Sequence, residues 1–157
     1  MSTKRHQMAV AAHLLLKNER GEVLFLRRAN TGYADGEWSV PAGHVDAGET
    51  VIEACVRETA EELAIDLTRS DVRPILVQHK RDWDGEERID FFFAATLPHG
   101  QTPVIAEPDK CDGLGWASMA TPPKPLVSYV GAVLAAVVAG NDTFLTYFGF
   151  DCDAEHP

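Results

Sequence analysis

The sequence contains few cysteines and few basic residues, and both shortages limit what the protein can be. Of its 157 residues only three are cysteines: Cys55, Cys111 and Cys152. An odd, widely spaced set fits neither a disulfide framework nor a four-ligand zinc site, so we expect free thiols in a reducing, cytoplasmic environment. Lys and Arg number 14 against 24 Asp and Glu, which gives a formal net charge of −10. Because nucleic-acid backbones and anionic lipids are bound through clustered cations, we expect no long nucleic acid and no membrane as a partner.

The sequence also lacks a hydrophobic segment that could cross a bilayer. Apart from residues 8–16, the longest apolar stretch is residues 127–140, which is shorter than the roughly 18–20 residues required. Residues 8–16 follow two basic residues and superficially look like a signal peptide. However, His13 interrupts this stretch and Lys17-Asn-Glu-Arg-Gly21 stands where a small-residue cleavage site would be. We therefore expect residues 8–16 to contribute the first β-strand of a soluble protein.

The length and composition indicate one folded domain. Hydrophobic residues make up 45% and charged residues 24% of the chain, which are ordinary values for a globular protein. We predict a single domain over residues 1–157, with its core in residues 10–139 and a C-terminal tail at 140–157, part of which packs through its aromatic residues. The patterning predicts an α/β sandwich with a mixed central sheet, in which the first two strands form a hairpin. Strands are predicted at residues 10–16, 22–27, 38–41, 72–79, 88–97 and 114–117, a loop at 100–113, and helices at 50–64 and 126–139.

The helix over residues 50–64 has the clearest pattern in the chain. Thr50 and Glu53 have the spacing of a capping box, which predicts that the helix begins there. A turn of 100° per residue gathers a stripe of mostly apolar residues that should face the sheet. The predicted stripe is Ile52, Val56, Thr59, Ala60 and Leu63.

The opposite face of this helix carries three carboxylates, Glu58, Glu61 and Glu62, with only Arg57 close by. A solvated acidic face without function is one interpretation. The absence of Lys residues at the i+4 positions and the glycine-containing turn just before the helix favour another, namely a ligand site. Hard oxygen ligands in this number suit Mg²⁺ or Mn²⁺ bridging the protein to substrate phosphates.

This segment resembles the signature of the Nudix hydrolases. Seven of the nine fixed positions of that signature match, and the two departures, Thr59 and Ala64, are not ligand positions. The resemblance covers roughly residues 10–139 and implies a Nudix-type α/β/α sandwich. The signature positions in this chain are Gly43, Glu49, Arg57, Glu58, Thr59, Glu61, Glu62, Ala64 and Ile65.

The resemblance also implies roles for individual residues. Arg57 would pair with Glu49 and hold the turn against the helix, and Glu58 would either bind metal or orient the attacking water. For the general base, Glu107, Asp109 and Asp112 are candidates, each as readily explained as a solvated loop acid. For His44 the structural interpretation is favoured over contact with substrate. The implied metal ligands are the Ala42 carbonyl and the carboxylates of Glu58, Glu61 and Glu62.

The implied reaction is Mg²⁺-dependent hydrolysis of a phosphoanhydride bond in a nucleoside diphosphate derivative. Marks of the ADP-ribose, dinucleoside polyphosphate, NADH and coenzyme A subtypes are absent. The chain is therefore most similar to the MutT-like group, which releases a monophosphate and pyrophosphate from nucleoside or deoxynucleoside triphosphates. Expected substrate-binding residues are Arg28, Lys80 and Arg81 for phosphates and Tyr33, Trp38 or Trp83 for base stacking, with solvation or core packing as the alternative in each case.

Several alternatives stay open at this stage. A noncatalytic nucleotide or nucleotide-sugar sensor could share the fold, but all four signature carboxylates are retained, which favours an enzyme. Hydrolysis of a nucleotide sugar is another alternative. The lack of a basic patch argues against an RNA cap or 5′-triphosphate hydrolase, and the intact signature argues against isopentenyl diphosphate isomerisation. A homodimer would be consistent with the family.

Overall fold

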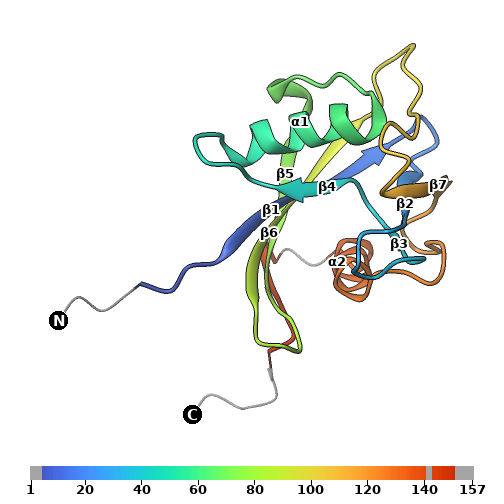
Figure 1. Cartoon of the computed structure of the whole chain (residues 1–157). Coiled ribbons are helices and arrows are strands. Elements are labelled where there is room, and N and C mark those ends of the chain that lie inside the picture. Colours follow the sequence, from blue (N-terminus) through green and yellow to red (C-terminus); the bar gives the residue numbers. More distant parts are fainter. Residues whose placement is uncertain (1–4, 141–142, 151–157) are drawn as a thin grey trace.

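A computed structural model of the chain describes residues 5–140 and 143–150. It is an α/β/α sandwich, in which a mixed sheet lies between two helices on opposite faces (Figure 1). This confirms the fold class predicted from the sequence. The strands are β1 (Ala9–Lys17), β2 (Val23–Arg28), β3 (Trp38–Ser39), β4 (Ala42–His44), β5 (Arg73–Arg81), β6 (Glu87–Thr96), β7 (Cys111–Ala117) and β8 (Leu145–Phe148). The helices are α1 (Val51–Leu63), α2 (Ser128–Val138) and the short 3₁₀ helix η1 (Arg69–Asp71).

Strands β1 and β6 form the parallel centre of the sheet, paired along their whole length from Ala9↔Arg88 to Lys17↔Thr96. Strand β5 continues the sheet antiparallel to β6, and β8 lies parallel to β5 at the edge. On its other side β1 pairs with β4, whereas β2 pairs with β3 and β7. Strands β1 and β2 are paired only at Lys17↔Val23. The predicted hairpin is therefore correct at its turn and wrong beyond it, because the two strands diverge to separate partners.

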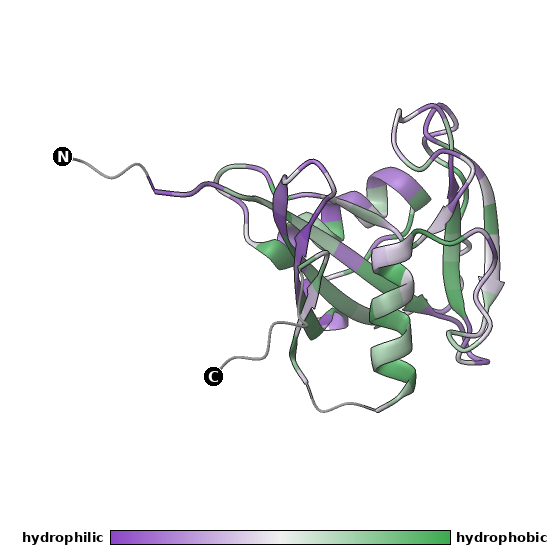
Figure 2. Ribbon diagram, turned by 90° about the horizontal axis from the view of Figure 1, so that it is seen from below, coloured by the Kyte–Doolittle hydropathy of each residue, from purple (hydrophilic) through white to green (hydrophobic). Residues whose placement is uncertain are grey.

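Each face of the sheet packs against one helix. Leu14 and Leu16 of β1 belong to the apolar cluster under α1, while Leu15 belongs to the cluster under α2, as strand alternation requires. Figure 2 shows how strongly apolar α2 is, in agreement with the fully buried Val130 and Val133 on this helix. Among the described residues, no helix is long and apolar enough to span a membrane.

Helix α1 begins as its sequence predicts. The Glu53 amide donates to the Thr50 hydroxyl at 3.2 Å, and the Thr50 amide donates to the Glu53 carboxylate at 2.7 Å. Of the predicted stripe, Thr59 and Leu63 are buried, and Ile52 and Val56 pack at the edge of the core. Ala60 lies less deeply, and the buried face turns instead toward Ala54 and Cys55. The Thr59 hydroxyl is accommodated because it donates to the Cys55 carbonyl at 2.7 Å.

The same helix ends at Ala64, which has φ of 54° where the Nudix signature has glycine. A left-handed backbone costs a residue with a Cβ roughly 1–2 kcal/mol, and glycine avoids this cost. We expect Ala64→Gly to raise the free energy of unfolding by about 1 kcal/mol in urea titrations. The matched control Ala60→Gly, in the helix interior, should lower it by about 1 kcal/mol. A loss of stability in Ala64→Gly would contradict this explanation of the helix end.

The start of β7, the C-terminal tail and the cysteines can each be compared with the prediction from the sequence. Strand β7 begins at Cys111, so the loop predicted over residues 100–113 ends earlier than expected. Part of the tail packs, as its aromatic residues predicted, because β8 joins the sheet. Cys55 and Cys111 are free, as expected, and both are buried, which raises the pKa of the Cys55 thiol to about 12. Cys152 lies outside the described residues.

Candidate active site

A cleft of about 390 Å³ opens where β4 and α1 face β2 and the start of α2. Its wall combines carboxylates, cations and aromatic rings. Among its lining residues are Glu58, Glu62, Glu107, Arg28, Tyr33 and Tyr129. The cleft therefore brings together groups that are far apart in the sequence, such as Arg28 and Tyr129, which are 101 positions apart.

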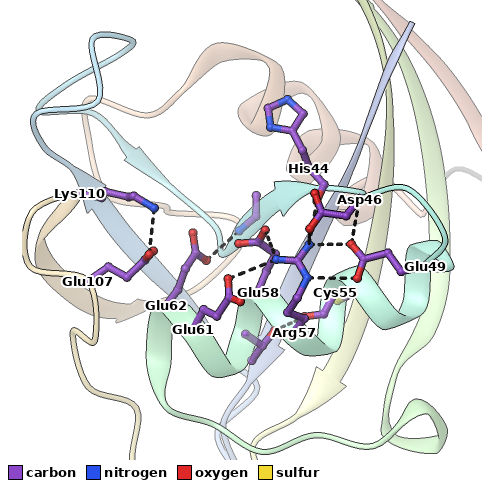
Figure 3. A network of polar contacts seen from close by, with 12 residues as sticks. His44, Asp46, Glu49, Cys55, Arg57, Glu58, Glu61, Glu62, Glu107 and Lys110 are labelled. Atoms are coloured by element: carbon purple, nitrogen blue, oxygen red, sulfur yellow. Dashed lines mark hydrogen bonds and ion pairs between the residues drawn. The ribbon is translucent and has the colours of Figure 1, made fainter.

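Arg57 connects the turn before α1 to the helix (Figure 3). Its guanidinium donates two hydrogen bonds to Glu49, at 2.7 and 3.1 Å, and one to the His44 carbonyl at 3.0 Å. Its Nη1 donates to Glu58 at 2.8 Å and to Glu61 at 3.2 Å. The hydrogen bonds from Arg57 lower the pKa of Glu49, and the carboxylates in turn raise that of Arg57. The pairing of Arg57 with Glu49 expected from the signature is present and fixes the turn on the helix.

The buried carboxyl of Glu62 has far fewer hydrogen-bond and charge partners than that of Glu49. Within the described residues its only hydrogen bond comes from the Ala42 amide, at 3.1 Å. Burial, reinforced by the neighbouring Glu58 charge, raises the pKa of the Glu62 carboxyl to about 8. Burial also raises the pKa of Glu58, against the opposing effect of Arg57. Two desolvated carboxylates side by side are unfavourable unless a proton or a cation lies between them.

The signature glycine lies directly against one of these carboxylates. A Cβ at Gly43 would overlap the carboxylate of Glu58, so this position on β4 has room only for a hydrogen. The close approach places the backbone of β4 beside the acidic face of α1. Oxygen donors of backbone and side chain thus meet at one place, which is the donor chemistry that Mg²⁺ and Mn²⁺ prefer.

We expect Gly43→Ala to displace the Glu58 side chain without unfolding the protein, because a flexible side chain can move aside. Stability should change by less than about 1 kcal/mol, since the clash is with the end of that side chain. Turnover of the best substrate found should fall about 100-fold, because the position of Glu58 is lost. Paired melting curves and initial rates test this, with Gly131→Ala on α2 as a control outside the cleft. Normal turnover in Gly43→Ala would contradict the importance of the close approach.

Of the other predicted metal and catalytic residues, one lines the cleft and one does not. The Glu61 side chain is 51% exposed, bonds to Arg57 and does not line the cleft. Glu107 does line it and accepts a hydrogen bond from Lys110 at 2.9 Å. Among the described residues, no three His, Cys, Asp or Glu side chains are already arranged around one metal position. The donor set fits a divalent cation through its oxygen ligands and through the burial of the neighbouring carboxyls of Glu58 and Glu62.

The remaining loop candidates are less suited to catalysis. Asp112 forms an ion pair with Arg27 at 2.6 Å, and Asp109 does not line the cleft. His44 lines the cleft and offers its carbonyl to Arg57. Of the three acids considered for the general base, only Glu107 lines the cleft.

Two of the four predicted substrate-binding residues reach the cleft and two do not. Arg28 and Tyr33 line it, with the guanidinium carbon 5.5 Å from the ring centroid. Lys80 is a correction: it is 1% exposed and bound to Asp82 at 2.6 and 2.7 Å, because its position on β5 points it under α2. Arg81, the next residue, points the opposite way and lies over the Phe150 ring, away from the cleft lining.

The two tryptophans considered for base stacking lie elsewhere. Trp38 is partly buried and packs against the core under α2, with Arg27 over its ring, as the packing alternative predicted. Trp83 is 96% exposed on the β5–β6 turn and does not line the cleft.

Among the cleft residues that were not identified from the sequence are His13, Arg88 and Tyr129. His13 left a trace in the sequence, since it interrupts an apolar strand. Burial lowers its pKa to about 4, so the ring is neutral at physiological pH. Arg88 and Tyr129 come from elements far apart in the chain, and their meeting depends on the pairing of β6 with β1 and the packing of α2.

The fold is similar to that of proteins whose structures have been solved. The chain is similar to the MutT NUDIX hydrolase of Burkholderia pseudomallei, with a TM-score of 0.74 and 29% sequence identity. The match covers 84% of this chain and 99% of that one.

Two curated relatives carry different activities in their names. The chain is 32% identical over 123 residues to an isopentenyl-diphosphate Delta-isomerase of Cutibacterium acnes, covering 73% of this chain and 60% of that protein. It is 30% identical over 107 residues to the 8-oxo-dGDP phosphatase NUDT18 of Danio rerio, covering 68% and 31%. The chain spans between 15% and 60% of the length of four curated relatives at 30% identity or more.

The family model for the NUDIX domain matches residues 7–136, which is most of the chain and includes β1, the β4–α1 segment and most of α2. The matched range contains the Gly43, Glu49, Arg57 and Glu58 positions described above. Together with the fold and the acidic cleft, this match shows that the chain belongs to the Nudix hydrolase family.

Proposed function

We propose that the protein hydrolyses a phosphoanhydride bond in a nucleoside or deoxynucleoside triphosphate, releasing a monophosphate and pyrophosphate with Mg²⁺ or Mn²⁺. The observation that carries the proposal is the pair of undercompensated carboxylates, Glu58 and Glu62, in a cleft that also contains Arg28 and Tyr33. The acids favour a divalent cation, the arginine favours phosphate, and the ring favours a planar group.

Nudix hydrolases generally use divalent metal ions, and the residues of this cleft fit such an ion. The Ala42 carbonyl and the carboxylates of Glu58, Glu61 and Glu62 would hold it. When bound, the ion supplies charge neutralisation for the phosphates and lowers the pKa of a bound water. Arg57 would keep Glu58 and Glu61 in place through the bonds it already makes to them.

Two further residues act on substrate in this proposal. Arg28 has no carboxylate within 4 Å among the described residues, unlike Arg27, Arg88 and Lys110 of the same wall. Its charge is thus available to a phosphate chain. Glu107 would accept a proton from the attacking water, and Lys110 holds its carboxylate at the cleft wall through a hydrogen bond of 2.9 Å.

A panel of substrates with product identification tests the proposal. It contains the common nucleoside and deoxynucleoside triphosphates, a nucleotide sugar, ADP-ribose, a dinucleoside tetraphosphate and isopentenyl diphosphate, each with Mg²⁺. We expect monophosphate and pyrophosphate from at least one triphosphate, at a higher kcat/KM than any other member of the panel supports. Preferred turnover of the nucleotide sugar, isomerisation of isopentenyl diphosphate, or binding without turnover would each replace the proposal with that activity.

A further inference from the structure

The sheet face under α2 carries an unusual number of buried polar groups at one end. Of the six buried polar or charged side chains among the described residues, four lie on this face: His13, Gln78, Lys80 and Asp90. The pairings Gln78↔Asp90 and Lys80↔Arg88 place β5 and β6 residues side by side, and β1 adds His13 next to Phe92. We call His13, Gln78, Lys80, Arg88 and Asp90 the polar floor. Burying polar groups in this number is costly, so an apolar core alone does not account for it.

Tyr129, in the first turn of α2, covers the polar floor. Its hydroxyl lies 3.4 Å from Nε2 of His13. The centroid of its ring lies 4.7 Å from the Lys80 ammonium and 5.3 Å from the Arg88 guanidinium carbon. The His13 ring is stacked on Phe92 with centroids 4.5 Å apart. His13, Arg88 and Tyr129 line the cleft, so the edge of the floor meets the same space as Glu58 and Glu62.

The cations of the floor are already neutralised. Arg88 donates to Asp90 at 2.5 and 3.0 Å through Nε and Nη2, and Lys80 donates twice to Asp82. The floor is therefore not a second phosphate site, because a phosphate would have to compete with the carboxylates of Asp90 and Asp82 that already bind these cations. Its unused hydrogen-bonding atoms are neutral: among the described residues, His13 Nδ1 and Gln78 Oε1 are buried without a partner, and of these two residues His13 lines the cleft.

The remaining wall beside the floor is aromatic and held in place. Tyr33 lies at the tip of the β2–β3 loop, with the Lys80 ammonium 5.8 Å from its ring. Arg28 donates to the Tyr33 carbonyl at 2.9 Å and to the Thr31 hydroxyl at 3.0 Å, and Asp35 accepts from Thr31. These bonds fix the loop that presents the ring. A half-exposed ring beside a neutral, hydrogen-bonding floor suits a flat polar group better than an apolar chain.

We propose that Tyr129, Arg88 and His13 form a specificity subsite that recognises the nucleobase of the substrate, with Tyr33 as its stacking wall. The inference rests on the proposed function for the position of the phosphates, which would lie at the glutamate end of the cleft. A ligand whose nonphosphate part is a hydrocarbon cannot satisfy the polar floor, so isoprenoid diphosphates are rejected.

Equilibrium binding separates this subsite from catalysis. The probes are the α,β-methylene analogues of dATP, dGTP, dCTP and TTP, together with inorganic triphosphate and isopentenyl diphosphate, titrated calorimetrically in Mg²⁺. The variants are Tyr129→Phe and His13→Phe, which keep an aromatic ring at each position and remove the hydroxyl or the ring nitrogens. Tyr147→Phe is the matched control, since Tyr147 is 56% exposed on β8 and lies outside the cleft lining.

We expect at least one nucleotide analogue to bind the wild-type protein about 10-fold tighter than inorganic triphosphate, from one or two net hydrogen bonds and stacking. Tyr129→Phe should remove most of this preference while the Kd for inorganic triphosphate changes less than about two-fold, and Tyr147→Phe should match the wild type. His13→Phe should act in the same direction, so the test does not depend on one variant folding.

Three results would overturn the subsite: nucleotide analogues that bind no tighter than inorganic triphosphate, isopentenyl diphosphate that binds tighter than they do, or Tyr129→Phe losing affinity equally for nucleotide and triphosphate. Failure of the proposed function looks different. A protein that hydrolyses no triphosphate, yet prefers a nucleotide analogue in a Tyr129-dependent manner, would keep the subsite and lose the hydrolase.

Discussion

Glu62→Gln is expected to lower kcat by about 1,000-fold or more while leaving the protein folded. The amide is isosteric with the acid and keeps an oxygen that can accept the hydrogen bond from the Ala42 amide. It cannot carry the negative charge that a divalent cation requires. Because burial raises the pKa of Glu62 to about 8, this carboxyl is mostly protonated at neutral pH in the metal-free protein, so a neutral amide should not unfold it. Initial rates with Mg²⁺ in excess, together with melting curves, measure both effects.

The matched control for this variant is Glu19→Gln, since Glu19 is exposed in the β1–β2 turn and outside the cleft lining. It should retain wild-type kcat and stability. Glu61→Gln should also lose most activity, although Glu61 is more exposed and tied to Arg57. Near-normal rates in both Glu61→Gln and Glu62→Gln would exclude the helix carboxylates as metal ligands.

Mg²⁺ is expected to stabilise the protein, and to do so more at pH 8 than at pH 5.5. Binding at about 100 times Kd would add about 2.7 kcal/mol, or a rise in Tm of about 5–10 °C for a chain of this length. The cause of the pH dependence is Glu62, whose folded pKa of about 8 lies above its ordinary value of 4.5. At pH 5.5 the cation must displace a proton from this carboxyl, whereas at pH 8 little proton remains to displace.

The raised pKa of Glu62 also determines how the stability of the metal-free protein changes with pH. Between pH 4.5 and 8 the folded state keeps a proton on Glu62 that the unfolded state has released, so the free energy of unfolding falls as pH rises through this window. Glu62→Gln should remove this contribution and flatten the pH dependence of the Mg²⁺ effect. Calorimetric unfolding at several pH values, with Mg²⁺ or EDTA, measures it. An equal Mg²⁺ effect at pH 5.5 and pH 8 in the wild type would contradict the role of Glu62.

The local parts of the structure were predictable because their causes are local. The capping box of Thr50 and Glu53 fixes the start of α1, and the spacing of the signature places Arg57 next to Glu49. Both depend on residues within one or two turns of the chain. The acidic face of α1 followed from the same periodicity, and the fold class followed from the order of strands and helices.

The parts that could not be predicted depend on long-range pairing. Nothing in residues 10–27 indicates that β1 would leave β2 for β6, so a hairpin was the natural prediction and it was correct only at the turn. Lys80 was expected at a phosphate because it is basic, but strand alternation and the position of α2 bury it beside Tyr129. The polar floor was missed for the same reason, since its members come from β1, β5 and β6.

Hydrolysis of a nucleoside triphosphate followed by ³¹P NMR tests the central claim most directly. The claim is that the acidic cleft of α1, with a divalent cation, cleaves a phosphoanhydride bond of a nucleotide. With Mg²⁺ we predict signals of a nucleoside monophosphate and pyrophosphate growing together, and no turnover when EDTA replaces Mg²⁺. Turnover that persists in EDTA, or release of orthophosphate and a nucleoside diphosphate instead, would contradict the account.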